Sequence, residues 1–385
     1  MLLSASSLLI LSATAQAEQH KAYIGTYSPH GEGVYLTYID SENGAMTAPK
    51  LVADVENGAQ LIYNANAKTL YVASEISNYN GLEQGAIIAY RVNNNGSLTE
   101  LNRVASVGKA PVYLALHPTN NYLFVANYVS GSIAVFSIDK NGKLSISPSD
   151  SKQSSGEPGL GYPEAAVIGS FAISDHDGPH AHMIAPDPSG NFVFSTDLGL
   201  DRIYQWRFDR EEGLLTANST AYLDASSRGA GPRHFVFHPN GKHVYLINEE
   251  SSTLTRYDFD SDNGMLTERS SISSLPENYQ GSSYASGIII DKAGKNLYIA
   301  NRLHNSISQF AIDNNGELRL VDNVWTRGDY TRTIVFSPDQ NYVYAMNQRS
   351  DNVAYFAVDS KTGKLTFVDD YVAVGSPSQM VFADK

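Results

Sequence analysis

Apolar and polar residues alternate along many short segments of the chain, with a period of two residues. Clear examples are SIAVFSID at 132–139, RIYQWRFD at 202–209, SISQFAID at 306–313 and NVAYFAVD at 352–359. Such alternation is typical of β-strands that bury one face, and no helical period is sustained anywhere. The pattern therefore predicts an all-β protein built from short strands.

The strands recur in a repeat that is marked by a glycine turn. Each alternating strand is followed by a turn of the type NG-x-L and preceded by two further strands, as in FVFHPNGKHVYLIN at 235–248. The turn glycines are Gly44, Gly96, Gly142, Gly213, Gly264, Gly316 and Gly363. Repeats of about 40–50 residues with four strands each are the signature of propeller blades. Seven turns predict a seven-bladed β-propeller with four-stranded blades.

The two ends of the chain are expected to meet in one blade. KAYIGTY at 21–27 matches the second strand of the other repeats, so the first repeat lacks an inner strand. SPSQMVF at 376–382 matches the inner strand GPRHFVF at 231–237. The last strand is therefore predicted to pair into the first blade, which closes the ring and removes an open sheet edge. Residues 18–385 then form a single domain.

One interval between turn glycines is longer than the others. Gly142 and Gly213 are 71 residues apart, because a segment rich in Ser, Gly and Pro follows the third blade. We predict an insertion at about residues 150–178, between blades three and four. A long loop of this kind is often a lid or a binding loop, and simple surface decoration is the alternative.

The N-terminal residues 1–17 resemble an export signal peptide. They are largely apolar and end in AQA at Ala17, a small-x-small pattern that signal peptidase accepts. No Lys or Arg lies near Met1, so an apolar tail is the alternative. No other segment is a continuous apolar run long enough to predict a membrane span. We therefore expect a periplasmic or secreted protein.

The composition limits the partners of the protein. The chain of 385 residues carries a formal net charge of −13, which argues against nucleic acid or an anionic membrane surface as the partner. A local basic pocket could still bind an anionic small molecule. Cysteine is absent, which excludes disulfides, thiol nucleophiles and Cys-based metal sites. Neither a phosphate-binding glycine loop nor a G-x-S-x-G elbow is present.

Polar residues gather where inner strands begin and second strands end, because antiparallel pairing brings these points to one face. In the hairpin at 231–250, Arg233 and Glu249 each lie eight residues from the turn residue Gly241, so they return to the same end. The positions equivalent to Arg233 hold Ser378, Ala59, Val112, His182, Ser286 and Arg332, and those equivalent to Glu249 hold Tyr27, Glu75, Tyr128, Leu198, Arg302 and Gln348. The alignment predicts a polar, unevenly charged rim around the central channel.

This rim contains the residue types that acid–base chemistry requires. His, Arg and Glu side chains from separate blades suit proton transfer on an anionic substrate. A carboxylate beside arginines stays ionised, and arginine forks can clamp a carboxylate or a phosphate. By position, Glu75, Asn127, His180 and Asp197 are further candidate substrate contacts.

Structural roles are the alternative for several of these residues. Arg233 and Glu249 could form an ion pair that only braces the hairpin, and Asp197 could brace its own turn. His180 and His182 could begin a metal site, but no third ligand is marked, so we expect no metal. A set of asparagines at the ends of the second strands is typical of braces between strands: Asn127, Asn248, Asn301 and Asn347.

Five stretches of the sequence resemble a known family of propeller enzymes. They are YIGTY at 23–27, GPHAHMIAPDPSGNFVFSTDLGLDRIYQW at 178–206, GPRHFVFHPNGKHVYLINEE at 231–250, GKNLYIANRLHNSISQF at 294–310 and YVYAMNQRSDNVAYFAVDSKTGKL at 342–365. The family is that of the seven-bladed β-propeller lactonases, which includes propeller-type 6-phosphogluconolactonases and fungal carboxy-cis,cis-muconate lactonizing enzymes. The similarity extends over the whole chain that follows the signal peptide.

The resemblance implies a lactone-processing site in the propeller channel. Its catalytic residues would be His182, Arg233, Glu249 and Arg302, with Arg332 as a further substrate contact. Glu249 or His182 would activate the attacking water, while Arg233 and Arg302 would hold the anionic group of the substrate. The segments YTRT around Arg332 and YASGIII at 284–290 depart from the family's usual Pro-Arg and acidic residue.

The function that the resemblance implies is hydrolysis of a sugar-derived lactone, phosphorylated or not, without a cofactor. The partner would be a small anionic lactone or sugar acid. A muconate-type cycloisomerase would use the same rim for proton transfer, and a non-catalytic exported propeller would use it to bind a ligand or a protein. A closed propeller has no sheet edge that a partner must cover, so we expect a monomer.

Overall fold

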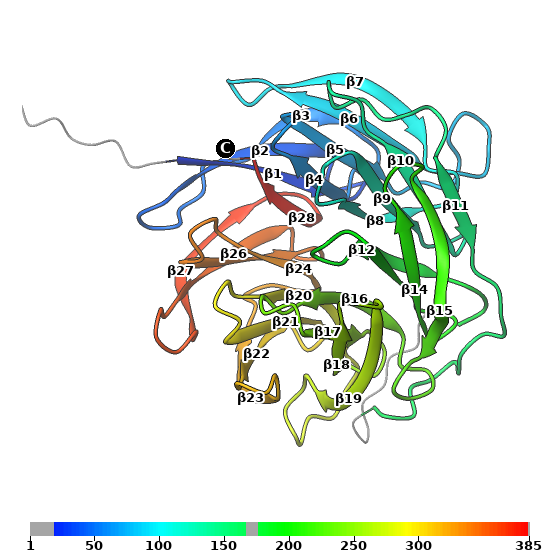
Figure 1. Cartoon of the computed structure of the whole chain (residues 1–385). Coiled ribbons are helices and arrows are strands. Elements are labelled where there is room, and N and C mark those ends of the chain that lie inside the picture. Colours follow the sequence, from blue (N-terminus) through cyan, green and yellow to red (C-terminus); the bar gives the residue numbers. More distant parts are fainter. Residues whose placement is uncertain (1–18, 167–175, 384–385) are drawn as a thin grey trace, which may run out of the picture.

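The computed structural model describes residues 19–166 and 176–383. In this part of the chain seven four-stranded antiparallel sheets are arranged as blades around a central channel, and no helix is present (Figure 1). The predicted all-β, seven-bladed propeller is therefore confirmed. The described residues contain no helix that is long and apolar enough to cross a membrane.

Each blade runs from an inner strand at the channel to an outer strand at the periphery. Blades one to four are β28 (Pro377–Phe382), β1 (Gln19–Thr26), β2 (Gly33–Asp40) and β3 (Lys50–Asp54); β4 (Gln60–Asn64), β5 (Thr69–Ser74), β6 (Ala86–Val92) and β7 (Leu98–Ala105); β8 (Pro111–Leu116), β9 (Tyr122–Asn127), β10 (Ser132–Ser137) and β11 (Asp150–Gln153); and β12 (Ala181–Pro186), β13 (Phe192–Asp197), β14 (Arg202–Asp209) and β15 (Leu214–Asp224). Blades five to seven are β16 (Pro232–Phe237), β17 (His243–Asn248), β18 (Thr253–Asp260) and β19 (Met265–Ser273); β20 (Tyr284–Ile290), β21 (Asn296–Arg302), β22 (Ser306–Ile312) and β23 (Leu318–Trp325); and β24 (Thr331–Phe336), β25 (Tyr342–Asn347), β26 (Asn352–Val358) and β27 (Leu365–Ala373).

The C-terminal strand completes the first blade. β28 pairs antiparallel with β1, with Met380 opposite Ile24, and thus supplies the inner strand that the first repeat lacks. The seven inner strands also contact one another in sequence around the channel, and β28 contacts both β24 and β4. The predicted closure of the ring is confirmed.

The core of the described chain consists of seven apolar clusters, each shared by two neighbouring blades. Between blades two and three, Tyr71 and Ile87 belong to the same cluster as Leu123. Between blades seven and one, Ile24 shares a cluster with Tyr344. The other five clusters follow the same rule. A blade therefore buries its apolar faces only when both neighbours are in place.

Buried tyrosines link the blades to the glycine turns that mark the repeat. In five blades the second strand contains a buried tyrosine. Its hydroxyl donates a hydrogen bond to the carbonyl of the turn glycine in the next blade. The pairs are Tyr23 to Gly96 (2.8 Å), Tyr71 to Gly142 (2.9 Å), Tyr245 to Gly316 (2.9 Å), Tyr298 to Gly363 (2.6 Å) and Tyr344 to Gly44 (2.8 Å). All seven turn glycines have φ between 70° and 86°, a region that disfavours other residues. The turns are thus both strand connections and contact points between blades.

Two segments that the sequence singled out lie wholly or partly outside the described residues. Residues 150–153 form the outer strand β11, so the first residues of the predicted insertion belong to blade three, and residues 154–180 separate β11 from β12. Residues 167–175 lie outside the described residues, as does the expected signal peptide at 1–17.

The tyrosine link that closes the ring can be tested with a single substitution. We expect Tyr344→Phe to lower the free energy of unfolding by about 1–3 kcal/mol, because the buried Gly44 carbonyl loses its donor. Phe124 and Phe194 occupy the same strand position in blades three and four, so the phenyl ring itself fits. Tyr371→Phe, at an exposed ring, is the control. Equal urea midpoints for Tyr344→Phe and the wild type would contradict the proposed link.

Candidate active site

A β-bulge recurs at the start of the inner strands and positions the rim side chains. In blade five, Pro232 pairs with Asn248 and His234 pairs with Ile247, so Arg233 is the extra residue on its strand. The same shift in register occurs in five other blades, at Val112, His182, Ser286, Arg332 and Ser378. A bulge bends the strand and changes the direction of the extra side chain. The residues equivalent to Arg233 in these repeats are therefore bulge residues, and they lie around the channel.

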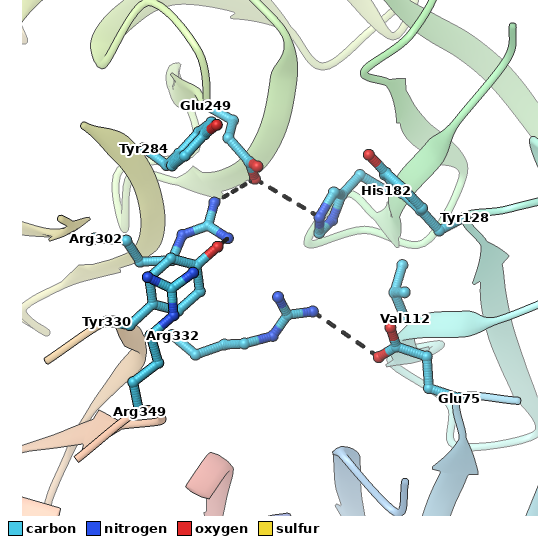
Figure 2. Close-up of a pocket in the computed structure, with 10 residues that line it drawn as sticks. All are labelled: Glu75, Val112, Tyr128, His182, Glu249, Tyr284, Arg302, Tyr330, Arg332 and Arg349. Carbon is cyan, nitrogen blue, oxygen red and sulfur yellow. Dashed lines mark hydrogen bonds and ion pairs between the residues drawn. The ribbon is translucent and has the colours of Figure 1, made fainter. Parts of the chain in front are cut away.

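A cavity of about 310 Å³ lies at this end of the channel (Figure 2). Five of its lining residues were expected at the site from the sequence: Glu75, His182, Glu249, Arg302 and Arg332. The other five are Val112, Tyr128, Tyr284, Tyr330 and Arg349. The lining thus combines carboxylates, arginines and a histidine from five different blades.

One wall of the cavity is built around the Glu249 carboxylate. Its Oε2 atom accepts a hydrogen bond from Arg233 Nε at 2.6 Å and forms an ion pair with Arg302 Nη2, also at 2.6 Å. His182 Nε2 lies 4.0 Å from the same oxygen (Figure 2). Two guanidinium groups therefore hold the carboxylate, which faces an imidazole across a short gap.

The electrostatics of this wall fix the charge states of its members. Burial raises the pKa of Glu249, but Arg302, Arg233 and Arg332 outweigh it, so the pKa lies below its ordinary value. Burial and the neighbouring Arg233 lower the pKa of His182 well below 6.5. At neutral pH the wall therefore presents an ionised carboxylate and a neutral imidazole.

The opposite wall is built around a second carboxylate, Glu75, from the end of β5. Tyr27 donates its hydroxyl to Glu75 Oε2 at 2.5 Å, and Arg332 Nη2 lies 3.9 Å from the same oxygen. The Arg332 guanidinium also lies over the Tyr27 ring, 5.1 Å from its centre. Burial raises the pKa of Glu75, and Arg332 and the Tyr27 hydrogen bond only partly oppose this. The two carboxylates of the cavity thus have different environments.

An arginine–tyrosine cluster forms a third side of the cavity. Arg302 Nη1 donates to the Tyr330 hydroxyl at 3.3 Å, and its guanidinium lies 5.2 Å from the ring centre of Tyr284. Arg349 is exposed and stacks on the Tyr330 ring at 3.7 Å. The sequence reasoning missed these tyrosines and Arg349. The available signal was position, since Tyr284 and Tyr330 each lie two residues before a bulge.

Four expected site residues do not line the cavity. Arg233 is 1% exposed and lies behind Glu249, where its guanidinium also donates to the backbone carbonyl of Ser286. His180 stacks on Tyr128, with ring centres 4.6 Å apart, and its ring contacts Asp177 at 2.8 Å. These two residues support the cavity wall from outside.

The remaining two have backbone-bracing contacts. Asp197 Oδ1 accepts hydrogen bonds from the backbone amides of His180 (2.8 Å) and Leu200 (3.1 Å). The Asn127 side chain donates to the Ser106 carbonyl at 3.1 Å. Direct substrate contacts from Asn127, His180 and Asp197 are therefore not supported by this geometry. Asn248 and Asn301 likewise donate to side chains of their own blades, and Asn347 donates to the carbonyl of Thr326, which follows the outer strand of blade six.

The described residues contain no cluster suited to a metal ion. No group of three or more His, Asp or Glu side chains within residues 19–166 and 176–383 has the arrangement that a metal site requires. His180 and His182 belong to different layers, because one stacks behind Tyr128 and the other faces the cavity. The geometry therefore provides charged and neutral side chains rather than a ligand set.

Comparison with known proteins relates the whole chain to one family. The family described as "Lactonase, 7-bladed beta-propeller" matches residues 21–382. A 6-phosphogluconolactonase of Bacillus subtilis (strain 168) is 32% identical over 358 residues, which cover 92% of this chain and 96% of the relative. The structure of a periplasmic gluconolactonase of Pseudomonas aeruginosa has a TM-score of 0.84 at 28% identity and covers 95% of this chain and 99% of its own. A protein of Lactobacillus plantarum has the same TM-score, identity and coverage.

The clamp on Glu249 predicts a pH-dependent contribution to stability. We expect Glu249→Gln to lower the free energy of unfolding near neutral pH by about 3–5 kcal/mol, because two buried arginines lose their carboxylate. Since the folded-state pKa of Glu249 is lowered, its stabilisation is present above about pH 4.5 and is lost as the pH falls through the folded-state pKa. The difference in stability between the wild type and the variant should therefore shrink on acidification.

Urea unfolding at neutral and at acid pH measures this difference. Glu83→Gln, at a side chain that is 87% exposed, is the matched control and should behave as the wild type at both pH values. A difference between wild type and Glu249→Gln that stays constant with pH would show that the carboxylate does not carry this stabilisation.

Proposed function

Because the chain belongs to the seven-bladed β-propeller lactonase family, we propose that it hydrolyses a sugar-derived lactone at the cavity between Glu249 and Glu75. The observation that carries the proposal is the neutral His182 imidazole, 4.0 Å from an arginine-clamped carboxylate and open to a cationic cavity. The relatives named 6-phosphogluconolactonase and periplasmic gluconolactonase support a sugar lactone as the substrate.

The attacking water is held between His182 and Glu249. A hydrogen bond spans about 2.8 Å, so one water can bond both to Nε2 and to Oε2 across the 4.0 Å gap. His182 is the proton acceptor, because its lone pair is free at neutral pH while two arginines reduce the basicity of Glu249. The carboxylate then stabilises the imidazolium that forms.

The arginines have separate roles in this scheme. Arg302 lines the cavity beside the water position and stabilises the negative charge that develops on the lactone carbonyl oxygen. Arg233 has no access to the cavity and acts as a positioning residue that fixes Glu249. The expectation that Arg233 holds the substrate is replaced by this supporting role.

The cavity favours an anionic substrate. Arg302 and Arg332 are paired with the cavity carboxylates, whereas Arg349 stacks on Tyr330 and is exposed to solvent. Arg349 therefore offers its guanidinium fork to a phosphate or carboxylate at the far end of a lactone. This arrangement extends the proposal to a 6-phosphorylated or otherwise anionic sugar lactone.

Export of the protein is part of the proposal. The apolar N-terminal segment ends in a signal-peptidase pattern, and one structural relative is described as periplasmic. The lactone would then be opened outside the cytoplasm, in the periplasm or after secretion.

Lactone opening by the purified protein tests the proposal directly. We expect turnover of 6-phosphogluconolactone or gluconolactone, followed as acid release in weak buffer, and a loss of about 100-fold or more in kcat/KM for His182→Gln. His30→Gln, at an exposed histidine, is the control. Turnover of a muconolactone alone would favour a cycloisomerase. No turnover by the folded wild type would favour a binding propeller.

The same assay gives a pH dependence with a defined sign. His182 must be neutral to accept a proton, and its pKa is lowered well below 6.5. The value of kcat/KM should therefore stay high as the pH falls through about 6.5 and decrease only at more acid pH. A midpoint of this decrease at or above about pH 6.5 would contradict His182 as the base.

Arg349→Gln tests whether the substrate is anionic. We expect kcat/KM for 6-phosphogluconolactone to fall by about 10- to 100-fold, because a charge-assisted contact contributes about 1.5–3 kcal/mol. The value for neutral gluconolactone should change by less than about threefold. Arg103→Gln, on the outer strand β7, is the control. Equal losses on both lactones would show that Arg349 does not recognise the anionic group.

A further inference from the structure

Opening of a lactone produces an alcohol as well as an acid. The ring oxygen that becomes the alcohol must receive a proton. When the tetrahedral intermediate collapses, the bond between the acyl carbon and the ring oxygen breaks. An alkoxide is a strong base, so a positioned acid that protonates the ring oxygen lowers the barrier. The His182–Glu249 wall, as described for the proposed function, accepts the proton of water on one side of the cavity.

Glu75 faces this wall from the other side of the cavity. Glu75 follows β5 of blade two, and Glu249 follows β17 of blade five, so the two residues occupy equivalent places in the repeat. Both line the cavity, and their side chains point into it from opposite walls (Figure 2). A lactone between them would have its carbonyl near His182 and its ring oxygen within reach of Glu75.

The partners of the two carboxylates differ in a way that separates their roles. Two guanidinium contacts at 2.6 Å hold Glu249 ionised. Glu75 receives the Tyr27 hydroxyl at 2.5 Å, while its nearest guanidinium, from Arg332, is 3.9 Å away. Burial correspondingly raises the pKa of Glu75. Titratable groups whose environments drive their pKa values apart commonly take different roles in a reaction, here Glu249 as the ionised partner of the base His182 and Glu75 as a group that can carry a proton.

We infer that Glu75 is the general acid that protonates the ring oxygen as the lactone opens, an assignment that rests on the proposed lactone hydrolysis. Water adds to the acyl carbon and gives one proton to His182, the bond from the acyl carbon to the ring oxygen breaks, and the proton of Glu75 passes to that oxygen. The products are the free hydroxy acid, the Glu75 carboxylate and the His182 imidazolium. Transfer of a proton from His182 to Glu75 through solvent restores the starting state.

Tyr27 and Arg332 position this acid. Both contact Oε2 of Glu75, so the carboxyl proton belongs on Oε1. The charged and titratable groups that face Glu75 are Tyr27 from blade one, Arg332 from blade seven and, more weakly, Arg233 from blade five. Each of these favours the carboxylate form, and burial opposes them.

The pH profile of kcat/KM for gluconolactone, corrected for spontaneous hydrolysis, tests the inference. The wild type should lose activity as the pH rises through the pKa of Glu75. We expect Glu75→Gln to lower the plateau by about 100-fold or more and to remove this basic limb. Glu83→Gln, at an exposed carboxylate, should reproduce the wild-type profile.

Tyr27→Phe provides a second variant that keeps the acid in place. Loss of the hydroxyl donor destabilises the carboxylate form, which raises the pKa of Glu75, so the basic limb should move to higher pH. A structural role for Glu75 would not move this limb. A basic limb that Glu75→Gln retains would belong to another group and would overturn the assignment.

The outcomes separate this inference from the proposed function. If His182→Gln is inactive while Glu75→Gln keeps both the wild-type rate and the basic limb, lactone hydrolysis stands and the acid role of Glu75 is wrong. An unshifted limb in Tyr27→Phe would also overturn the assignment. If the folded wild type opens no lactone, both proposals fail together.

Discussion

The closed ring is the constraint on which the rest of the structure depends. Every apolar cluster of the described chain lies between two blades, so each blade is stabilised by its neighbours rather than by a core of its own. The pairing of β28 with β1 and the hydrogen bond from Tyr344 to Gly44 join the last repeat to the first. Because neither end of the ring is left open, no blade has an uncovered face, and the inner strands have fixed positions around the channel.

The ring turns a repeated strand position into a ring of side chains. In six of the seven blades the bulge places one residue of the inner strand out of register at the channel mouth, whatever that residue is. In some blades it is chemically inert, as with Val112, and in others it is His182 or Arg332. The backbone at these positions is held by packing between the blades, so the side chain there can differ from blade to blade. The catalytic candidates can therefore be far apart in sequence and still be held rigidly.

Burial of charged side chains at the cavity end of the channel costs stability, and it also shifts the pKa values of the candidate site residues. Removing Arg233 and Glu249 from water is costly, and their mutual contact at 2.6 Å offsets that cost only while both are present. The same burial makes His182 neutral and separates the behaviour of Glu249 from that of Glu75. A site of solvent-exposed residues would have ordinary pKa values and could not divide the base and acid roles in this way. Paired charges thus keep these groups buried, and burial gives the groups on the two walls of the cavity different pKa shifts.

The sequence was sufficient for the fold because the fold depends on local signals. The turn glycines need positive φ, and the alternating strands show their buried face directly, so blade number and ring closure could be predicted. For the site, the repeat alignment predicted which blade and which end of the channel each side chain comes from. The candidates Glu75, His182, Glu249 and Arg332 accordingly line the cavity. The alignment did not predict how far a side chain lies from the cavity. Arg233 and Arg332 occupy equivalent bulges, yet Arg233 is drawn behind Glu249 while Arg332 extends into the cavity.

The distance of a rim side chain from the cavity depends on the residues that contact it. An alignment of the rim positions alone does not show these contacts. A side chain at the rim lies inside or behind the cavity wall according to the partner that the next blade offers, such as the Ser286 carbonyl for Arg233. Tyr284, Tyr330 and Arg349 were missed because they reach the cavity from sequence positions next to the aligned rim positions. Arg302 of blade six also lies over the ring of Tyr330 from blade seven, and this contact between blades has no local sequence pattern. The position of a rim side chain therefore depends on contacts within one blade, such as Arg233 with Glu249, and on contacts between blades, such as Arg302 with Tyr330.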